Sequence, residues 1–257
     1  MSEPLLRAAG VTKRYGARTA VDEVALELWP GEVMAVVGES GSGKTTLLDC
    51  LSGRLRPDAG RVEYQTRHEG LKDLYALSEA ECRLLARTDW GYVHQSPDQG
   101  LRMGVSAGAN VGERLMALGA RHYGRIRGEA ADWLVRVEMD PLRIDESPRG
   151  FSGGMRQRLQ IARNLVTRPR LVFMDEPTSG LDVSVQAKLL DLLRSLTRSL
   201  PLAAIVVTHD LAVARLLAHR MMVMKDGRAV ESGLTDQVLD DPQHPYTQLL
   251  VSSVLQP

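Results

Sequence analysis

The sequence has few cysteines, no excess of charge and no long apolar run. Its two cysteines, Cys50 and Cys82, lack the spacing of metal ligands, which favours buried or half-buried thiols in a reducing compartment. Lys plus Arg and Asp plus Glu both number 32, so the formal net charge is zero. This balance gives no support for a protein that reads nucleic acid through a basic face, and we expect no nucleic-acid partner.

No apolar stretch is long enough to cross a bilayer. The longest runs, such as residues 203–207, are far shorter than the roughly 20 residues that a transmembrane helix needs. The start of the chain, Met1-Ser2-Glu3-Pro4, lacks the charged and apolar regions of a signal peptide. We therefore expect a cytoplasmic protein without direct membrane insertion, so that any membrane contact goes through a partner.

Two kinds of strand are predicted. Residues 5–9 and the alternating apolar positions of residues 21–28 indicate strands of an antiparallel edge sheet. Continuous apolar runs are typical of central parallel strands that are covered on both faces. Such runs lie at residues 33–37, 171–174 and 203–208.

The middle of the chain has a helical pattern instead. Residues 106–140 are charged and carry apolar stripes at helical spacing, which predicts a helical insertion. Residues 221–224 and 228–231, separated by Lys225-Asp226-Gly227, predict a hairpin. A chain of 257 residues can form one large domain, or a domain with a subdomain. The pattern as a whole predicts an α/β fold.

A glycine-rich loop follows the apolar run at residues 33–37 and precedes a helix-forming run at residues 45–51. Glycines let the backbone curl so that several N–H groups point at one anion, and the following helix adds partial positive charge. In such a loop Lys44 would reach the β and γ phosphates of a nucleotide, and Thr45 would bind magnesium. The predicted nucleotide-binding residues are Gly38, Glu39, Ser40, Gly41, Ser42, Gly43, Lys44, Thr45 and Thr46.

Two acidic residues, Asp175 and Glu176, end the apolar run that starts at residue 171. A buried parallel strand can deliver carboxylates to the edge of the sheet where phosphates bind. Asp175 would hold magnesium through its coordination shell. Glu176 would polarise or deprotonate the attacking water.

A second helix N-terminus is predicted at Ser152-Gly153-Gly154, about twenty residues before the acidic pair. The free amides and the hydroxyl of this motif could bind the γ phosphate of a nucleotide that is held by another site. Taken alone, the motif is an ordinary helix cap. The phosphate loop alone is compatible with three classes of protein: a kinase, a GTPase and a transport motor. With this motif in its place before the acidic strand, the chain resembles the ATP-binding cassette (ABC) ATPases.

This resemblance implies a single nucleotide-binding domain over residues 1–257. The implied fold is a P-loop NTPase of ABC type, with a RecA-like parallel-sheet core and an antiparallel β edge sheet. It also includes a helical subdomain at about residues 96–155 and a C-terminal helical extension at about residues 234–257. Members pair head to tail around two ATP molecules, so the resemblance implies a homodimer with ATP and Mg²⁺ sandwiched between its copies.

Four further residues receive roles from the resemblance alone. Tyr15 matches the aromatic residue that stacks on adenine, and Gln95 matches the glutamine that senses the γ phosphate and magnesium. His209 matches the histidine that contacts the γ phosphate, and Asp182 the aspartate that communicates across the dimer. The chain departs from the family at Met155, where many members have glutamine, and at Gly180, where many have alanine. Neither departure removes a phosphate-binding group.

Different segments of the chain resemble different members of this family. The tail at residues 241–250, together with residues 152–158, is similar to the ATPases of bacterial peptide importers. Residues 90–127 and the end at residues 250–255 are similar to the cassette ATPase of the bacterial carbon–phosphorus lyase pathway, which docks on a soluble enzyme core.

We therefore expect an ATPase that binds soluble carbon–phosphorus lyase core subunits and supports phosphonate breakdown. It would not cut the carbon–phosphorus bond itself, because its cysteines lack iron–sulfur spacing. The alternative is the ATP-binding subunit of a peptide or phosphonate importer. A nucleic-acid repair or translation ATPase of the same superfamily fits poorly, since the chain has neither long coiled or tandem segments nor a basic stripe.

Overall fold

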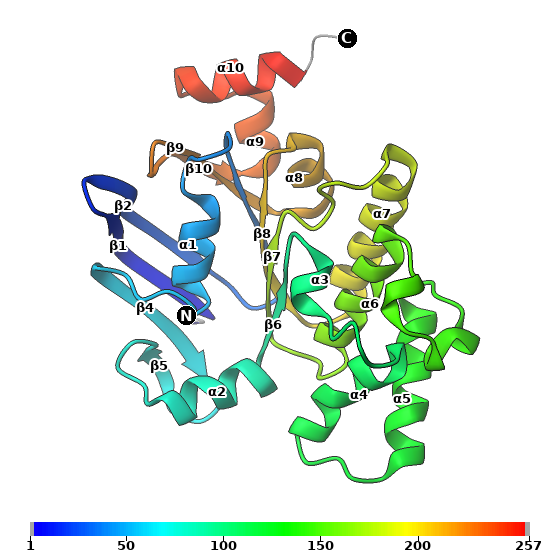
Figure 1. The fold of residues 1–257 in the computed structure, drawn as a ribbon. Helices are drawn as coiled ribbons and strands as arrows, with labels where there is room; N and C mark the ends of the chain where they lie inside the picture. Colours follow the sequence, from blue (N-terminus) through cyan, green and yellow to red (C-terminus); the bar gives the residue numbers. More distant parts are fainter. Residues whose placement is uncertain (1–2, 255–257) are drawn as a thin grey trace. The chain divides into compact units, whose positions relative to one another are not determined.

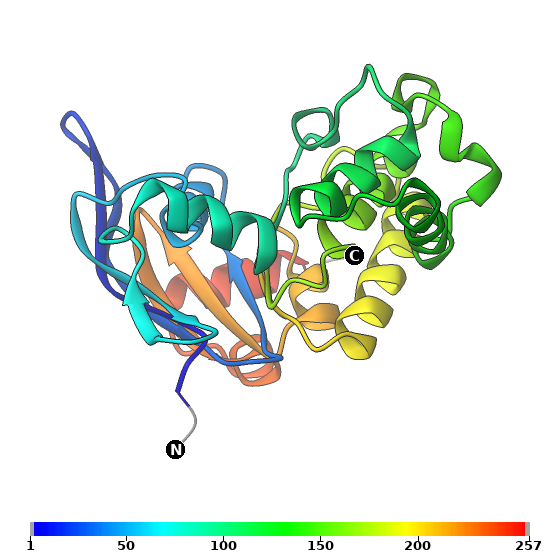
Figure 2. The same cartoon turned by 90° about the horizontal axis from the view of Figure 1, so that it is seen from below.

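The computed structural model describes residues 3–254, and the chain divides into two compact units (Figures 1 and 2). The first unit combines the chain up to Cys82 with the chain from Ala203 onward, and the second comprises residues 83–202. The helix α2 (Glu79–Thr88) carries the chain from the first unit into the second. No helix in the described part of the chain is both long and apolar enough to cross a membrane.

The first unit contains an antiparallel sheet with the strand order β2-β1-β4-β5. Its strands are β1 (Leu6–Tyr15), β2 (Arg18–Leu28), β4 (Ala59–Thr66) and β5 (Gly70–Asp73). The tight turn after β1 pairs Tyr15 with Arg18, and the strands run on until Leu6 pairs with Leu28. The predicted edge sheet is therefore confirmed for β1 and β2, whereas β4 and β5 were not predicted.

The same unit contains the strands β10-β9-β3-β8, in that order. They span β3 (Val33–Val37), β8 (Ala203–Thr208), β9 (Arg220–Lys225) and β10 (Arg228–Leu234). β3 runs parallel to both β8 and β9, and β10 pairs antiparallel with β9. Every residue of β3 and β8 is buried, as the continuous apolar runs predicted. The predicted hairpin is also confirmed.

Four helices complete the first unit. They are α1 (Lys44–Leu51), α8 (Leu211–Leu217), α9 (Thr235–Asp240) and α10 (Pro245–Val254). An apolar cluster joins β3 and β9 to the last three of these helices. Its buried members are Ala35, Val37, Leu211, Ala214, Met221, Val223, Val238, Leu239 and Tyr246. The strand that leads into the glycine-rich loop is thus packed against the C-terminal helices.

The second unit has a parallel strand pair, β6 (Trp90–Val93) and β7 (Leu171–Asp175), and is otherwise helical. Its helices are α3 (Pro97–Gly100), α4 (Ala107–Ala117), α5 (Tyr123–Arg136), η1 (Pro141–Asp145), η2 (Pro148–Gly150), α6 (Gly153–Leu165) and α7 (Val183–Ser199). The helices α4 and α5 confirm the predicted helical insertion. They lie side by side in both views (Figures 1 and 2).

A small residue lets α4 and α5 approach closely. A Cβ atom on Gly112 would lie 2.6 Å from Cγ2 of Ile126, so a larger residue would push the helices apart. Trp133 and Leu134 on α5 are almost fully buried. The Arg136 guanidinium lies 5.1 Å from the centroid of the Trp133 ring.

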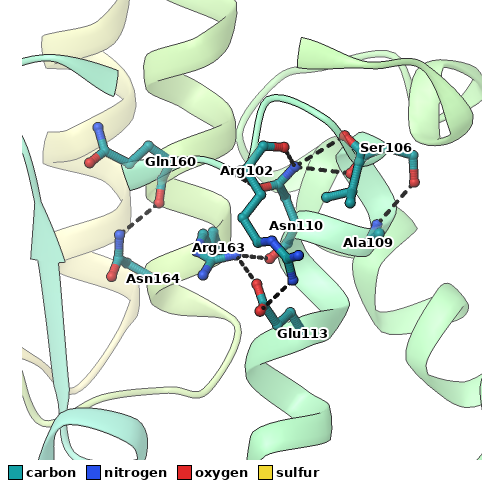
Figure 3. A network of polar contacts seen from close by, with 9 residues as sticks. Arg102, Ser106, Ala109, Asn110, Glu113, Gln160, Arg163 and Asn164 are labelled. Atoms are coloured by element: carbon teal, nitrogen blue, oxygen red, sulfur yellow. Dashed lines mark hydrogen bonds and ion pairs between the residues drawn. The ribbon is translucent and has the colours of Figure 1, made fainter. Parts of the chain in front are cut away.

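A polar network fixes the segment before α4 to α4 and α6 (Figure 3). The buried side chain of Asn110 accepts a hydrogen bond from the backbone N–H of Arg102 (2.8 Å) and donates to the carbonyls of Arg102 (3.0 Å) and Ser106 (3.1 Å). Arg163 on α6 donates to the carbonyl of Asn110 and to the carboxylate of Glu113, both at 2.8 Å. The loop between Leu101 and α4 therefore has a defined conformation.

We expect replacement of Trp133 by Ala to lower the free energy of unfolding by about 3–5 kcal/mol, because it leaves a cavity in the helical part of the second unit. The measurement is urea denaturation followed by circular dichroism. Val135→Ala is the control on the same helix, since Val135 is 57% exposed and should change stability by no more than about 0.5 kcal/mol. Equal losses in both variants would contradict the predicted packing.

Candidate functional site

The glycine-rich loop connects the buried strand β3 to α1 and holds its lysine in place. The Nζ atom of Lys44 donates hydrogen bonds to the carbonyl oxygens of Gly38 and Glu39, both at 2.8 Å. Only 5% of Lys44 is exposed. The ammonium group is therefore fixed inside the curve of the loop, where a buried positive charge favours an anion.

Two glycines of this loop are required by close backbone contacts. Gly38 has φ +151° and Gly43 has φ +101°, so both adopt conformations that favour glycine. A Cβ atom on Gly38 would lie 2.2 Å from the carbonyl oxygen of Met224, and one on Gly43 would lie 2.1 Å from that of Ala20. The loop thus lies directly against β2 and the end of β9.

The loop presents an unusual buried hydroxyl. The Oγ atom of Ser42 is one of the few buried side-chain nitrogen and oxygen atoms in the described residues that have no hydrogen-bond partner. A buried polar atom without a partner is costly unless a ligand satisfies it. Together with the amides at the start of α1 and the Lys44 ammonium, it forms an arrangement suited to phosphate oxygens.

Tyr15 lies at the end of β1, near the loop. It pairs with Arg18, whose guanidinium donates to the carbonyl of Gly41 at 3.0 Å. The Tyr15 ring is 52% exposed, with the ammonium of Lys13 5.9 Å from its centroid. An exposed ring beside a phosphate loop offers a flat surface for a nucleotide base.

His209 follows the strand next to β3. In the parallel register of β3 and β8, Val37 is opposite Thr208, so Gly38 and His209 come directly after paired residues. The following residue, Asp210, caps α8 by accepting a hydrogen bond from the N–H of Ala212 (2.8 Å). The structure therefore brings His209 to the end of the sheet at which the glycine-rich loop begins.

In the second unit, the structure brings Gln95 and Glu176 together. Val93 of β6 is opposite Met174 of β7, so the residues after the two strands leave the same end of the pair. The side-chain amide of Gln95 donates to Oε2 of Glu176 at 3.2 Å and to Oγ of Ser179 at 3.3 Å.

Glu176 also has an unusual backbone. Its φ of +41° lies in the left-handed region, which is uncommon for residues other than glycine. The chain turns sharply there, and the N–H of Ser179 donates to the carbonyl of Glu176 at 3.0 Å. Such strain is concentrated at functional sites. It turns the half-buried Glu176 away from the course of β7, while Asp175 stays buried at the end of the strand.

Ser152 is the N-cap of α6, and its Oγ atom accepts a hydrogen bond from the N–H of Met155 (3.3 Å). The hydroxyl predicted to bind phosphate therefore also has a structural role. Ser152 and Gly153 are exposed, but Gly154 is buried, and a Cβ atom there would lie 2.5 Å from Cγ1 of Val185. Asp182 is the exposed N-cap of α7 and makes no side-chain capping bond.

A ladder of amide side chains on α6 was not predicted from the sequence. Oε1 of Gln160 accepts from the N–H of His94 at 2.6 Å, and Oδ1 of Asn164 accepts from the N–H of Tyr92 at 3.0 Å. A Cβ atom on Gly100 would lie only 2.2 Å from Oε1 of Gln160. These bonds tie the helix that starts after Ser152 to the strand before Gln95. The sequence signal for this ladder was the helical spacing of three amide residues, Gln157, Gln160 and Asn164, which the structure shows to be buried.

The predicted site residues fall into two sets. The first unit holds Tyr15, residues 38–46 and His209, and the second holds Gln95, residues 152–154, Asp175, Glu176 and Asp182. Each set gathers at strand ends and helix starts of its own unit. The individual roles of these residues stay predictions.

The residues predicted to bind magnesium provide only oxygen ligands, which this ion prefers. They are a hydroxyl from Thr45, an amide oxygen from Gln95 and a carboxylate from Asp175. Across residues 3–254, no group of three or more His, Cys, Asp or Glu side chains could hold a metal ion.

Comparison with known proteins identifies the class. The family model described as ABC transporter matches residues 21–179, which is more than half of the chain. The chain belongs to this family, and it is an ATP-binding ABC ATPase with an α/β P-loop fold. A second model, the C-terminal region of oligopeptide and dipeptide transporters, matches residues 230–257.

Curated relatives differ in how closely they match. The chain is 64% identical over 256 residues to PhnK of Escherichia coli (strain K12), an ATP-binding protein whose name assigns it to phosphonates utilization. That alignment covers 100% of both chains. The oligopeptide transport ATP-binding protein OppF of Salmonella typhimurium (strain LT2) is 38% identical, over 91% of this chain and 69% of its own length.

Solved structures share the fold. One is the dimeric post-hydrolysis state of the ATP-binding cassette MJ0796 bound to ADP and Pi, with a TM-score of 0.79 and 29% identity. The match covers 90% of this chain and 98% of that chain. Another is cbiO1 from Clostridium perfringens, part of the ABC transporter complex cbiONQ, with a TM-score of 0.80 and 26% identity. That match covers 93% of this chain and 92% of cbiO1.

We expect Glu176→Gln to reduce ATP hydrolysis at least a hundredfold while ATP binding is retained, because the amide keeps the shape but cannot act as a base. Lys44→Ala should instead weaken ATP binding, because it removes a positive charge from the phosphate loop. Steady-state hydrolysis and nucleotide affinity are measured for both variants. Hydrolysis by Glu176→Gln near the unmodified rate would contradict the role of Glu176.

Proposed function

We propose that this protein is a cytoplasmic ATPase that binds the soluble carbon–phosphorus lyase core and supports phosphonate catabolism. The observation that carries the proposal is the 64% identity with PhnK along the complete length of both chains. The oligopeptide transport relative OppF of Salmonella typhimurium reaches only 38%. The resemblance of residues 90–127 and 250–255 to the lyase-associated ATPase also supports it.

In this proposal two copies of the chain pair around two ATP molecules. Ser152 and Gly153 at the exposed start of α6 in one copy would face the ATP on the phosphate loop of the other. The dimeric form of the similar cassette MJ0796 supports this arrangement. Asp182, exposed at the start of α7, would communicate across the dimer.

Hydrolysis would use several of the predicted site residues. Lys44 and Ser42 would hold the phosphates, and His209 would contact the γ phosphate. Glu176, oriented by the Gln95 amide at 3.2 Å, would accept a proton from the attacking water. Magnesium bound at Thr45, Gln95 and Asp175 would neutralise charge on the phosphates.

The alternative function is the ATP-binding subunit of a peptide or phosphonate importer. The specific observation in its favour is the match of residues 230–257 to the C-terminal region of oligopeptide and dipeptide transporters. That region lies in the first unit, where it includes most of β10 and the helices α9 and α10. The two functions differ in the partner that the ATPase drives, and therefore in the fraction from which the complex is recovered.

ATP should promote dimer formation, because in the proposed pair the phosphate loop of one copy and the start of α6 of the other bind the same nucleotide. In sedimentation velocity, the Glu176→Gln variant with Mg-ATP should shift from monomer to dimer. Adding Ser152→Arg should prevent the shift by placing bulk at the start of α6. The control is the single Glu176→Gln variant without nucleotide, which should stay monomeric. A monomer at saturating Mg-ATP would contradict the homodimer.

Residues 100–113 lie within the segment that resembles the lyase-associated ATPase, and we propose that they form a docking segment for the lyase core. Asn110 and Glu113 make internal contacts, so changes there would disturb the fold. Gly104 is exposed, and no atom lies within 4 Å of the position that a Cβ atom would take there, so a side chain fits without a clash. Gly128, on α5 of the same unit, is also exposed and equally open, and it provides a matched control.

We expect Gly104→Glu to weaken association with lyase core subunits at least tenfold while ATP affinity is unchanged. Gly128→Glu adds the same charge outside the segment and should have no effect. Each tagged variant is expressed with the genes of its own operon, and the bound partners are identified after fractionation. Recovery from the membrane fraction with a permease, and not with the lyase core, would favour the importer instead.

A further inference from the structure

The peptide group between Gly38 and Glu39 is held on both sides. Its carbonyl oxygen, on Gly38, accepts from Nζ of Lys44 at 2.8 Å. Its N–H group, on Glu39, donates to the hydroxyl oxygen of Tyr246 at 3.2 Å. We propose that Tyr246, on the C-terminal helix α10, is a positioning residue for nucleotide binding, which acts by holding this peptide group and through it the Lys44 ammonium.

Tyr246 is itself fixed in place. Only 6% of it is exposed, and its ring belongs to the apolar cluster that contains Val37, the last residue of β3. The ammonium of Lys225, at the end of β9, lies 4.9 Å from the centroid of the ring. The ring is therefore held between the strand that enters the loop and the neighbouring strand, so its hydroxyl has little freedom.

The segment before α10 is anchored as well. The carboxylate of Glu231 on β10 accepts hydrogen bonds from the N–H groups of Gln243 (2.8 Å) and His244 (3.0 Å). Nδ1 of His244 in turn accepts from the N–H of Tyr246 at 3.1 Å. These contacts determine where α10 begins. They bring the Tyr246 hydroxyl to the N–H group of Glu39 in the glycine-rich loop.

The peptide group needs this support because its first residue is glycine. Without a Cβ atom, Gly38 restricts the rotation of the peptide less than any other residue would. Rotation would turn the Gly38 carbonyl away from Lys44 and so remove one of the backbone hydrogen bonds that hold the ammonium. A hydrogen bond from the N–H on the opposite side of the peptide opposes that rotation. Burial also raises the pKa of Tyr246, which favours the neutral hydroxyl.

The direct test replaces only the hydroxyl. Tyr246→Phe keeps the ring in the apolar cluster and removes the hydrogen-bond acceptor. We expect the dissociation constant for Mg-ADP, measured by calorimetry on the full chain, to rise about two- to tenfold, the range for one net hydrogen bond. Mg-ADP is used because it carries the β phosphate that Lys44 is predicted to contact, and it is not hydrolysed during the measurement.

A matched control separates positioning from general stability. Tyr75 is a half-buried tyrosine of the same unit, and its hydroxyl donates to the carbonyls of Cys50 and Leu55, both at 2.6 Å. Tyr75→Phe also loses hydrogen bonds, but it should change the Mg-ADP dissociation constant less than twofold. A loss of affinity that is equal in both variants would overturn the proposal.

A second readout reports on the peptide group itself. In ¹⁵N-labelled protein, the Glu39 amide should exchange with solvent at least fivefold faster in Tyr246→Phe than in the unmodified chain. The amide of Ala35, inside β3, should keep its exchange rate. Unchanged Mg-ADP affinity, or faster exchange that is the same at Glu39 and Ala35, would show that Tyr246 only stabilises the fold.

Discussion

The close approach of bare backbone at the end of β3 is the constraint on which the phosphate loop depends. Gly38 and Gly43 let the loop lie against the carbonyls of Met224 and Ala20, where no side chain fits. This approach bends the loop around the Lys44 ammonium. A phosphate can then meet the ammonium, the helix amides and a buried hydroxyl together, which is the physical basis of nucleotide binding in this family.

Parallel strand pairing supplies the rest of the chemistry. In the first unit, the β3–β8 register places His209 beside the start of the loop. In the second, the β6–β7 register places Gln95 beside Glu176. Parallel strands end at the same edge of a sheet, so residues far apart in sequence reach one place without any long-range motif. The amides of Gln160 and Asn164 then connect the strand before Gln95 to α6.

Much of the fold could be predicted because its signals are local. The continuous apolar runs at β3, β7 and β8 and the helical stripes of α4 and α5 each lie within a few residues. The strands β4 and β5 were missed, since β5 has only four residues, all half-buried, and β4 begins with three exposed ones. Short strands of this kind are defined by their partners and not by their own pattern.

The sequence by itself determined the class of the protein and the identity of its candidate site residues, because glycine spacing, the lysine and the acidic pair are the chemistry that phosphate binding needs. Only the tertiary structure decided which side chains support them. The contact between Tyr246 and Glu39 joins residues 207 positions apart, and the left-handed backbone of Glu176 follows from a turn that no residue preference indicates. Such contacts depend on packing in three dimensions, and a linear pattern carries no record of them.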